Sequence, residues 1–187
     1  MAKLCKQVTG VDVSAAMIEE GKANALAQSV HNIEWVKSGD LATVSGKFDF
    51  VHSFIVFQHI PPSIGMVLLT RLVDLLATDG IASIQFIYHK NISRLKQIVG
   101  RVRVSVPLVH NLAILYYGKP FKYPLMQKNA YDLNAVFDLL QKKGCGSCVV
   151  RFADTQELQA ALVFFRKRPD TIPYFQFYNL SKAAKSV

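Results

Sequence analysis

The chain has 187 residues, of which 51% are hydrophobic and 19% charged, and it carries a formal net charge of +9. This composition excludes an intrinsically disordered chain and suffices for one domain with a hydrophobic core. The sequence has no apolar stretch long enough to cross a membrane, and the start MAKLCKQ lacks the apolar core of a secretory signal. We therefore expect a reduced, cytoplasmic protein, in which Cys145 and Cys148 are plain thiols and no metal is bound.

Strands and helices alternate through the first half of the chain. Apolar runs predict strands over Gln7–Val13, Ile33–Ser38, Phe48–Val56 and Ile81–Tyr88. Ser14 is expected to cap a first helix, which runs to about Ser29. A second helix begins at Pro61 and is expected to end at Asp79, with Gly80 in the left-handed cap. The almost continuous apolar run FDFVHSFIVF favours a strand that is buried on both faces of a parallel sheet.

A basic segment, residues 89–129, follows the fourth predicted strand. It lies within an interval, from Asp79 to Asp132, that contains no acidic residue. The basic residues of this interval are Lys90, Arg94, Lys96, Arg101, Arg103, Lys119, Lys122 and Lys128. The segment is too long for a simple connection, and we expect helices over about Ser93–Arg103 and Pro107–Tyr117. All 187 residues are thus interpreted as one domain that this insertion interrupts.

The charge of the basic segment leaves two interpretations open. It is either an ordinary solvated surface or a face that attracts an acidic substrate, a nucleic acid or an anionic membrane. No interleaved aromatic or RNA-binding signature supports the nucleic-acid version, so a nucleic-acid partner is not expected.

The last part of the chain predicts a helix followed by a hairpin. The helix AYDLNAVFDLLQKKG is expected to end at Gly144. Strands over Ser147–Phe152 and Ala160–Arg166 are joined by a short connection, which requires an antiparallel pair. Together with the alternation before it, this indicates an α/β fold with an open, mostly parallel sheet and an antiparallel C-terminal hairpin.

Two acids, Asp12 and Asp40, follow predicted strands directly. A carboxylate at the carboxyl end of a strand in such a sheet can accept hydrogen bonds from the hydroxyl groups of a ribose, which is the role we expect for Asp12. Asp40, in SGDL, can accept from an amino group of a purine. The alternatives are a helix cap for Asp12 and an ordinary turn aspartate for Asp40.

His59 is the candidate for proton transfer. It lies just past the third predicted strand, at the edge where ligands bind in such sheets, and could take a proton from a substrate. The alternative is a structural histidine that holds the turn at Pro61. His52 is expected to be packed inside the strand, and Tyr88 and His89 are weaker candidates for lining a substrate pocket.

The sequence resembles class I S-adenosylmethionine-dependent methyltransferases from Lys6 to Tyr88 and in its terminal hairpin. The stretches that carry the resemblance are VTGVDVSAAMIEEGKANA, SGDLATV, FDFVHSFIVFQHIPP and LLATDGIASIQF. The resemblance implies an open Rossmann-like sheet and S-adenosyl-L-methionine as the cofactor. It also implies the residues that contact this cofactor: Asp12 at the ribose, Val13 and Met17 along the adenosine, Asp40 and Leu41 at the adenine, and Phe54 at the methionine end.

The chain departs from the family at its N-terminus. The family's first strand and glycine-rich loop, which packs against the methionine part of the cofactor, precede the strand that ends at Asp12. That first strand is also the middle of the family's sheet, so its absence is expected to expose the edges of the strands that end at Asp12 and near Phe54. We therefore expect an N-terminally incomplete chain in which cofactor binding and methyl transfer are impaired; calorimetry that detects micromolar binding would contradict this.

The resemblance implies methyl transfer to a small-molecule acceptor, with residues 89–129 as a substrate lid. The basic charge of this lid favours an anionic or amphiphilic acceptor, and so do its aromatic residues Tyr116, Tyr117, Phe121 and Tyr123. Three alternatives stay open: a non-catalytic methyltransferase-like binding module, a fragment of an NAD-dependent Rossmann oxidoreductase, and a protein that contacts a membrane surface through residues 99–117.

Overall fold

The computed structural model describes residues 1–91, 128–154 and 157–168 of the chain. The chain forms two compact units, residues 1–47 and 48–187, which are described separately as unit 1 and unit 2. The helices expected over Ser93–Arg103 and Pro107–Tyr117 lie outside the described residues. No helix within the described ranges is long and apolar enough to cross a membrane. The expectation of a single domain stays a prediction.

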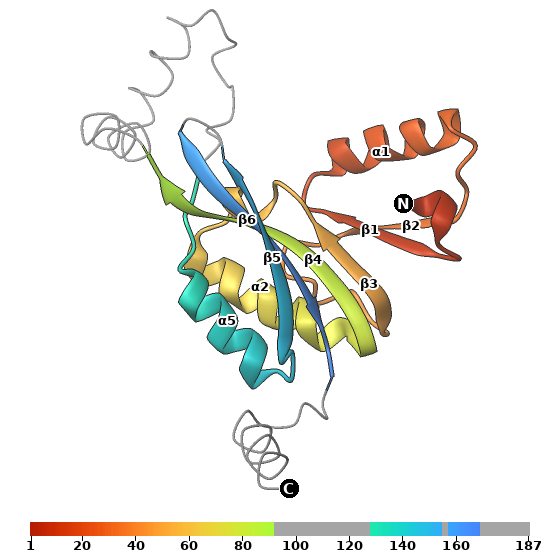
Figure 1. The fold of residues 1–187 in the computed structure, drawn as a ribbon. Coiled ribbons are helices and arrows are strands. Elements are labelled where there is room, and N and C mark those ends of the chain that lie inside the picture. Colours follow the sequence, from red (N-terminus) through yellow and green to blue (C-terminus); the bar gives the residue numbers. More distant parts are fainter. Residues whose placement is uncertain (92–127, 155–156, 169–187) are drawn as a thin grey trace, which may run out of the picture. The chain divides into compact units, whose positions relative to one another are not determined.

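Unit 1 is a strand–helix–strand element (Figure 1). Its elements are a 3-10 turn η1 (Ala2–Leu4), β1 (Val8–Asp12), α1 (Ala15–Ala27) and β2 (Ile33–Lys37). The two strands are parallel, with Asp12 opposite Lys37, so their carboxyl ends lie at the same edge. Oγ of Ser14 accepts a hydrogen bond from the backbone N–H of Met17 at 3.4 Å, which confirms the predicted helix cap.

Trp35 of β2 holds α1 onto the strands of unit 1. A Cβ atom at Gly10 of β1 would lie 2.9 Å from Cε3 of the indole, and one at Gly21 of α1 would lie 2.5 Å from Cη2. The indole therefore fits only because both neighbours lack a side chain. Ile18 and Val44 are the buried apolar side chains of this unit and Trp35 is half-buried, so the indole is a large part of a small core.

Unit 2 contains a four-stranded sheet in the order β3–β4–β6–β5. The strands are β3 (Phe48–Ser53), β4 (Leu76–Lys90), β5 (Ser147–Asp154) and β6 (Leu158–Arg166), and the helices are η2 (Phe57–His59), α2 (Pro62–Leu75) and α5 (Leu133–Lys142). β3 is parallel to β4, whereas β6 is antiparallel to both β4 and β5. This confirms the predicted mixed sheet with its C-terminal hairpin (Figure 1).

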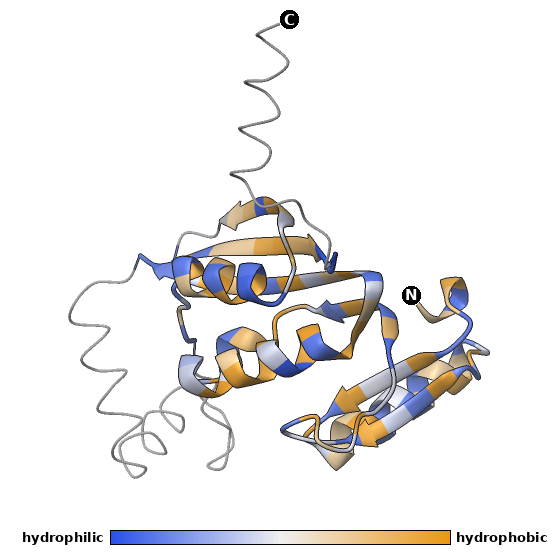
Figure 2. Ribbon diagram, turned by 90° about the horizontal axis from the view of Figure 1, so that it is seen from below, coloured by the Kyte–Doolittle hydropathy of each residue, from blue (hydrophilic) through white to orange (hydrophobic). Residues whose placement is uncertain are grey.

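The core of unit 2 lies between the sheet and its two long helices. Its fully buried side chains include Leu69, Val73, Ile84, Phe86, Val136, Leu140 and Val163. In Figure 2 the central strands of the sheet are largely orange, while the helices alternate between orange and blue along their length. Such alternation is typical of amphipathic helices that bury one face, so α2 and α5 cover one face of the sheet.

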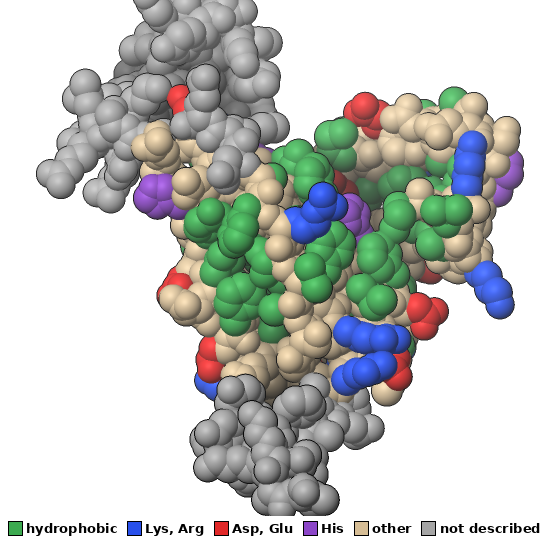
Figure 3. Space-filling model, in the orientation of Figure 1, with side chains coloured by type: hydrophobic (Ala, Val, Ile, Leu, Met, Phe, Trp, Pro, Cys, Tyr) green, Lys and Arg blue, Asp and Glu red, His purple; other side chains and the backbone are tan. Residues whose placement is uncertain are grey.

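β3 differs from the predicted strand in two ways. It ends at Ser53 rather than at Val56, because Ile55 takes a positive φ of 61° and its N–H donates to Oε1 of Gln85 at 2.9 Å. It is also not buried on both faces, since the side chain of Phe50 is 39% exposed. Phe50 lies on the face opposite the core, over which hydrophobic side chains gather in Figure 3.

α2 ends earlier than predicted. Its last residue is Leu75, and the left-handed conformation expected at Gly80 is taken instead by Asp79, with φ 63°. The N–H of Asp79 donates to the carbonyl oxygen of Lys167 at 2.8 Å, so the end of β6 fixes this turn. A glycine is still required at position 80, because a Cβ atom there would lie 2.9 Å from the carbonyl oxygen of Ala77.

Among the described residues, four strands have an edge with no partner, namely β1, β2, β3 and β5. β1 pairs with β2 alone, and β3 pairs with β4 alone, so each offers one row of backbone N–H and C=O groups without a neighbouring strand. β1 and β3 are the two strands whose edges the sequence predicted to be exposed.

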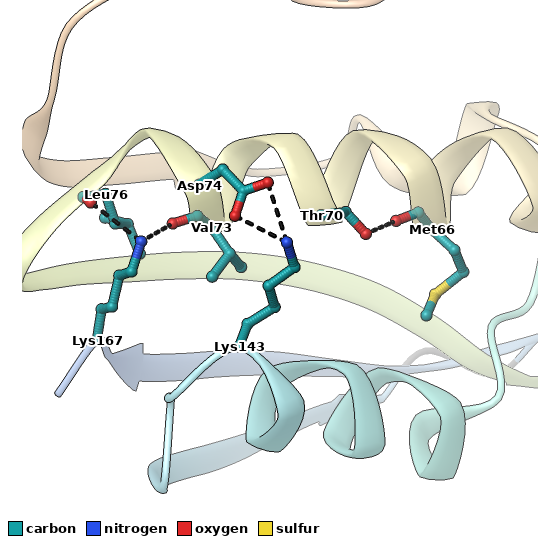
Figure 4. A network of polar contacts seen from close by, with 7 residues as sticks. All are labelled: Met66, Thr70, Val73, Asp74, Leu76, Lys143 and Lys167. Carbon is teal, nitrogen blue, oxygen red and sulfur yellow. Dashed lines mark hydrogen bonds and ion pairs between the residues drawn. The ribbon is translucent and has the colours of Figure 1, made fainter. Parts of the chain in front are cut away.

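Polar contacts join the C-terminal end of α2 to the elements beside it (Figure 4). Nζ of Lys143, just after α5, lies 2.9 and 3.1 Å from the two carboxylate oxygens of Asp74. Nζ of Lys167 donates to the carbonyl oxygens of Val73 at 2.9 Å and of Leu76 at 3.4 Å. The last carbonyl groups of a helix have no partner within it and carry partial negative charge, so a lysine here is stabilising.

Replacing Lys167 with Met is expected to lower the free energy of unfolding by about 1 kcal/mol, because it removes the charged donor at the end of α2. Lys142→Met is the matched control. Lys142 pairs with Asp138 of the same helix, both side chains are more than half exposed, and such a pair contributes only about 0.5 kcal/mol. Urea unfolding followed by circular dichroism measures both losses, and equal losses would contradict the capping role.

Candidate functional site

Asp12 is the last residue of β1 and begins the turn into α1. Its Oδ1 accepts a hydrogen bond from the backbone N–H of Ser14 at 2.7 Å, which holds the carboxylate at the strand end. Within the described part of the chain, no donor reaches Oδ2. The side chain is half-buried, so one oxygen is fixed by the turn while the other can accept a hydrogen bond from a ligand.

Asp40 lies in the turn that follows β2. Its Oδ1 accepts hydrogen bonds from Oγ of Ser38 at 3.1 Å and from the backbone N–H of Ala42 at 3.0 Å. Leu41 takes a positive φ of 62°, which turns the chain around this carboxylate. These local bonds are those of an Asx-type turn and do not by themselves indicate a ligand site. What suits Asp40 to contact a ligand is its position beside the end of β1.

Val13 connects the two turns that carry the acids. Its Cγ1 lies 3.5 Å from the position of a Cβ at Gly39, so the valine side chain rests against the turn after β2. The side chains of Val13 and Met17 are 66% and 49% exposed. Unit 1 therefore places an apolar surface beside two carboxylates, which is an arrangement that can bind a planar, polar-edged ring and a hydroxyl-bearing sugar.

Phe54 belongs to unit 2, directly after β3. Its ring stacks on His52 with a centroid distance of 6.3 Å, and His52 stacks in turn on Phe50 at 6.1 Å. The prediction that His52 is packed inside the strand is wrong, because it lies with Phe50 and Phe54 on the face of the sheet away from the core and is exposed. Phe54 is itself 51% exposed and could contact a ligand.

His59 is the last residue of η2 and is half-buried. Its backbone N–H donates to the carbonyl oxygen of Val56 at 2.9 Å, and its Nε2 lies 3.0 Å from Nε2 of Gln58. An imidazole at this position can exchange a proton with a substrate. Tyr88 and His89 lie near the C-terminal end of β4, where Tyr88 is half-buried and His89 is exposed.

Three residues that the sequence did not single out hold the loop between β3 and α2. Gln85 accepts from the start of this loop, as described above. The backbone N–H of Asn129 donates to the carbonyl oxygen of Gln58 at 2.7 Å, and the hydroxyl of Tyr131 donates to the carbonyl oxygen of Ile60 at 2.9 Å. Burial raises the pKa of Tyr131 to about 12, so its hydroxyl stays protonated and able to donate. Only Gln85 gave a sequence signal, as the one polar residue in IASIQFIY other than a serine.

The described His, Cys, Asp and Glu side chains include no group of three or more that could hold a metal ion. That the chain binds no metal stays a prediction. The three cysteines lie within the described ranges and are free thiols. Cys145 is buried, which raises the pKa of its thiol, and Cys148 is exposed on β5.

Residues 1–80 match the model of a methyltransferase domain family. No curated protein sequence matches the chain. Magnesium protoporphyrin IX methyltransferase from Synechocystis PCC 6803, solved with bound S-adenosylhomocysteine, is 16% identical, with a TM-score of 0.60 over 89% of this chain and 66% of that one.

Two further solved structures have a similar fold. A methyltransferase dependent on S-adenosylmethionine from Methanosarcina mazei is 12% identical, with a TM-score of 0.57 over 89% of this chain and 84% of that one. TehB from Haemophilus influenzae is 12% identical, with a TM-score of 0.58 over 89% of this chain and 52% of that one. The chain thus spans 66% of the Synechocystis protein and 52% of TehB. At such identities the likeness shows the fold, which is the predicted open sheet.

Proposed function

Because residues 1–80 match the model of a methyltransferase domain family and the chain has the class I S-adenosylmethionine-dependent methyltransferase fold, we propose that it transfers a methyl group from S-adenosyl-L-methionine to a small-molecule acceptor. The observation that carries the proposal is the edge of unit 1. There the carboxylates of Asp12 and Asp40 follow neighbouring parallel strands, with Val13 between their turns. When bound, the cofactor supplies an electrophilic methyl group on a positively charged sulfur.

The residues of this edge fit the adenosine part of the cofactor. Oδ2 of Asp12, which no described donor reaches, would accept from a ribose hydroxyl, and Asp40 would accept from the adenine amino group. Val13, Met17 and Leu41 would supply apolar contacts to the adenine ring. The role of Phe54 at the methionine end stays a prediction from the family resemblance, because Phe54 belongs to unit 2.

His59 would act as the base for an acceptor whose reacting atom carries a proton. Since the sulfur loses its positive charge in the transfer, the protein's contribution is chiefly alignment and the exclusion of water, and a base is optional. The acceptor would be anionic or amphiphilic, a proposal that rests on the basic composition of residues 89–129, of which 92–127 lie outside the described residues.

Cofactor affinity in the 187-residue chain is proposed to be weak. No described strand continues the sheet beyond β1, on the side where the family carries its glycine-rich loop. A titration that detects millimolar binding residue by residue is therefore the suitable test.

S-adenosylhomocysteine added to the ¹⁵N-labelled chain is expected to shift backbone amide signals of residues 12–17 and 39–42. Asp12→Asn should weaken this binding about tenfold, because the amide replaces a charged acceptor of the ribose hydroxyl. Glu34→Gln is the matched control, since Glu34 is an exposed acid in the neighbouring strand β2 and should leave the affinity unchanged.

The same titration distinguishes the alternatives. NAD that shifts these amides at lower concentration than S-adenosylhomocysteine would favour an oxidoreductase of the Rossmann class. Signals that do not move with either compound, or that move equally in the Asp12 and Glu34 variants, would contradict the assignment of this edge as the cofactor site.

A further inference from the structure

We propose that Asn129 and Tyr131 are positioning residues for His59, and that together with Gln58 they place the proton of the neutral imidazole on Nδ1. The inference rests on the proposed function only in treating His59 as the base. The arrangement itself depends on contacts within unit 2. It was not foreseen from the sequence, because Asn129 and Tyr131 are each 71 residues from the loop residue they contact.

Tyr131 ties the loop to the sheet. Its backbone N–H donates to the carbonyl oxygen of Ile87 in β4 at 2.7 Å, while its hydroxyl donates to the carbonyl oxygen of Ile60 at 2.9 Å. The ring is 2% exposed and packs at an angle against Phe57 and Phe86, with centroid distances of 5.8 and 5.3 Å. Because both ends of this rigid side chain are fixed, the residue after His59 is held at a set distance from β4.

Asn129 fixes the other side of the histidine. Its backbone N–H donates to the carbonyl oxygen of Gln58 at 2.7 Å, and its side-chain Nδ2 lies 3.3 Å from the same oxygen. The histidine's own N–H is bonded to Val56. Hydrogen bonds thus hold the backbone of His59 and of both its neighbours, and two of them come from residues far along the chain, Asn129 and Tyr131.

The side chain of Gln58 then determines the tautomer of the imidazole. Its Nε2 lies 3.0 Å from Nε2 of His59. An amide nitrogen donates and does not accept, so Nε2 of His59 must be the acceptor in this contact. In the neutral ring the proton is therefore on Nδ1, and Nε2 carries the lone pair.

This tautomer determines which ring nitrogen of His59 would take a proton. A proton taken from the acceptor would go to the Nε2 lone pair and leave an imidazolium with a proton on each ring nitrogen. The Gln58 amide cannot donate to a protonated Nε2, so it must move away at that step. Since Asn129 holds the Gln58 backbone, only the amide side chain needs to rotate, and His59 keeps its place.

Long-range ¹H–¹⁵N spectra of the histidine rings test this directly, because the two neutral tautomers give different patterns. At about pH 9, where an ordinary imidazole is neutral, the wild-type His59 ring is expected in the Nδ1–H form. Its signal is identified by its loss in His59→Gln. Gln58→Glu should invert the pattern to Nε2–H, because a carboxylate only accepts.

Tyr131→Phe should shift His59 toward the mixed tautomers of an exposed histidine. Asn129→Ala removes only the Nδ2 contact with Gln58 and keeps the backbone hydrogen bond, so it should cause a smaller shift in the same direction. Tyr88→Phe is the matched control: it also removes a hydroxyl near β4, but the Tyr88 ring contacts Phe152 rather than the loop, so the spectrum should not change. A merely structural role for the two residues would lower stability without changing the tautomer. If Tyr131→Phe does not fold, Asn129→Ala decides.

The proposal is overturned if wild-type His59 is in the Nε2–H form, or if both variants give the spectrum of Tyr88→Phe. A different measurement, the titration with S-adenosylhomocysteine, shows whether the proposed function fails. Loss of every S-adenosylhomocysteine-dependent shift would contradict the methyltransferase assignment and would leave the His59 tautomer unchanged.

Discussion

Gly65→Ala is expected to lower the free energy of unfolding by about 2 kcal/mol, which lies within the usual cost of overpacking a core position. Gly65 is buried in α2, and a Cβ atom there would overlap the hydroxyl of Tyr131 and lie 2.7 Å from Cζ of its ring. Alanine is intrinsically the better helix former by about 1 kcal/mol, so the two effects oppose each other. The overlap should dominate, because the hydroxyl is bonded to Ile60 and the ring is packed on both sides.

Chemical unfolding followed by circular dichroism measures this loss, with Ile64→Ala as the control. Ile64 is the preceding residue of α2, and its side chain is 54% exposed, so truncation should cost far less. A double-mutant cycle sharpens the result: Tyr131→Phe removes the overlapping oxygen and should cost less in the Gly65→Ala background than alone. Strict additivity of the two changes would show that the tyrosine does not limit the space at Gly65.

Gly21→Ala is expected to destabilise unit 1 by roughly 1–3 kcal/mol, again against the better helix propensity of alanine. The new methyl group would lie 2.5 Å from Cη2 of Trp35, and Cζ3 of the same indole already lies close to Gly10. The indole therefore cannot tilt toward β1 to make room. A unit with so few buried side chains has little stability to lose.

Trp35 is the only tryptophan of the chain, so its fluorescence reports on unit 1 alone. Urea titration should show an earlier midpoint for the emission change in Gly21→Ala. Gly39→Ala is the control within the same unit, because a Cβ there would meet only Cγ1 of Val13 at an ordinary 3.5 Å. A midpoint for Gly21→Ala that equals that of Gly39→Ala would contradict the packing of the indole between the two glycines.

The local elements could be predicted from the sequence because their signals are local. The strand before Asp12 is an apolar run that ends in an acid, and the helix after it has a serine at its cap. Gly144, with φ 78°, ends α5 as expected, because a helix end needs only the residue that follows it. The antiparallel pairing of the two terminal strands could be predicted from the short connection between them.

What the sequence could not supply depends on distant contacts. Near the start of β4 the left-handed conformation is taken by Asp79 rather than Gly80, because the N–H of Asp79 donates to the carbonyl oxygen of Lys167, the residue that follows β6. His52 lies in an apolar run that looked buried, yet one face of the sheet is uncovered among the described residues. The loop that carries His59 is held by Asn129 and Tyr131, which no pattern in its own neighbourhood could indicate.

The anchoring at both ends of residues 92–127 has a consequence for how such a chain can diverge. Before this stretch, the N–H of Asn91 bonds to Glu157, and after it, the N–H of Asn129 bonds to Gln58. A change in the length or composition of the intervening residues that leaves these two bonds intact would therefore leave the register of β4 with β6 and the anchoring of Gln58 as they are. The acceptor that residues 89–129 are proposed to select can then change while this scaffold stays the same.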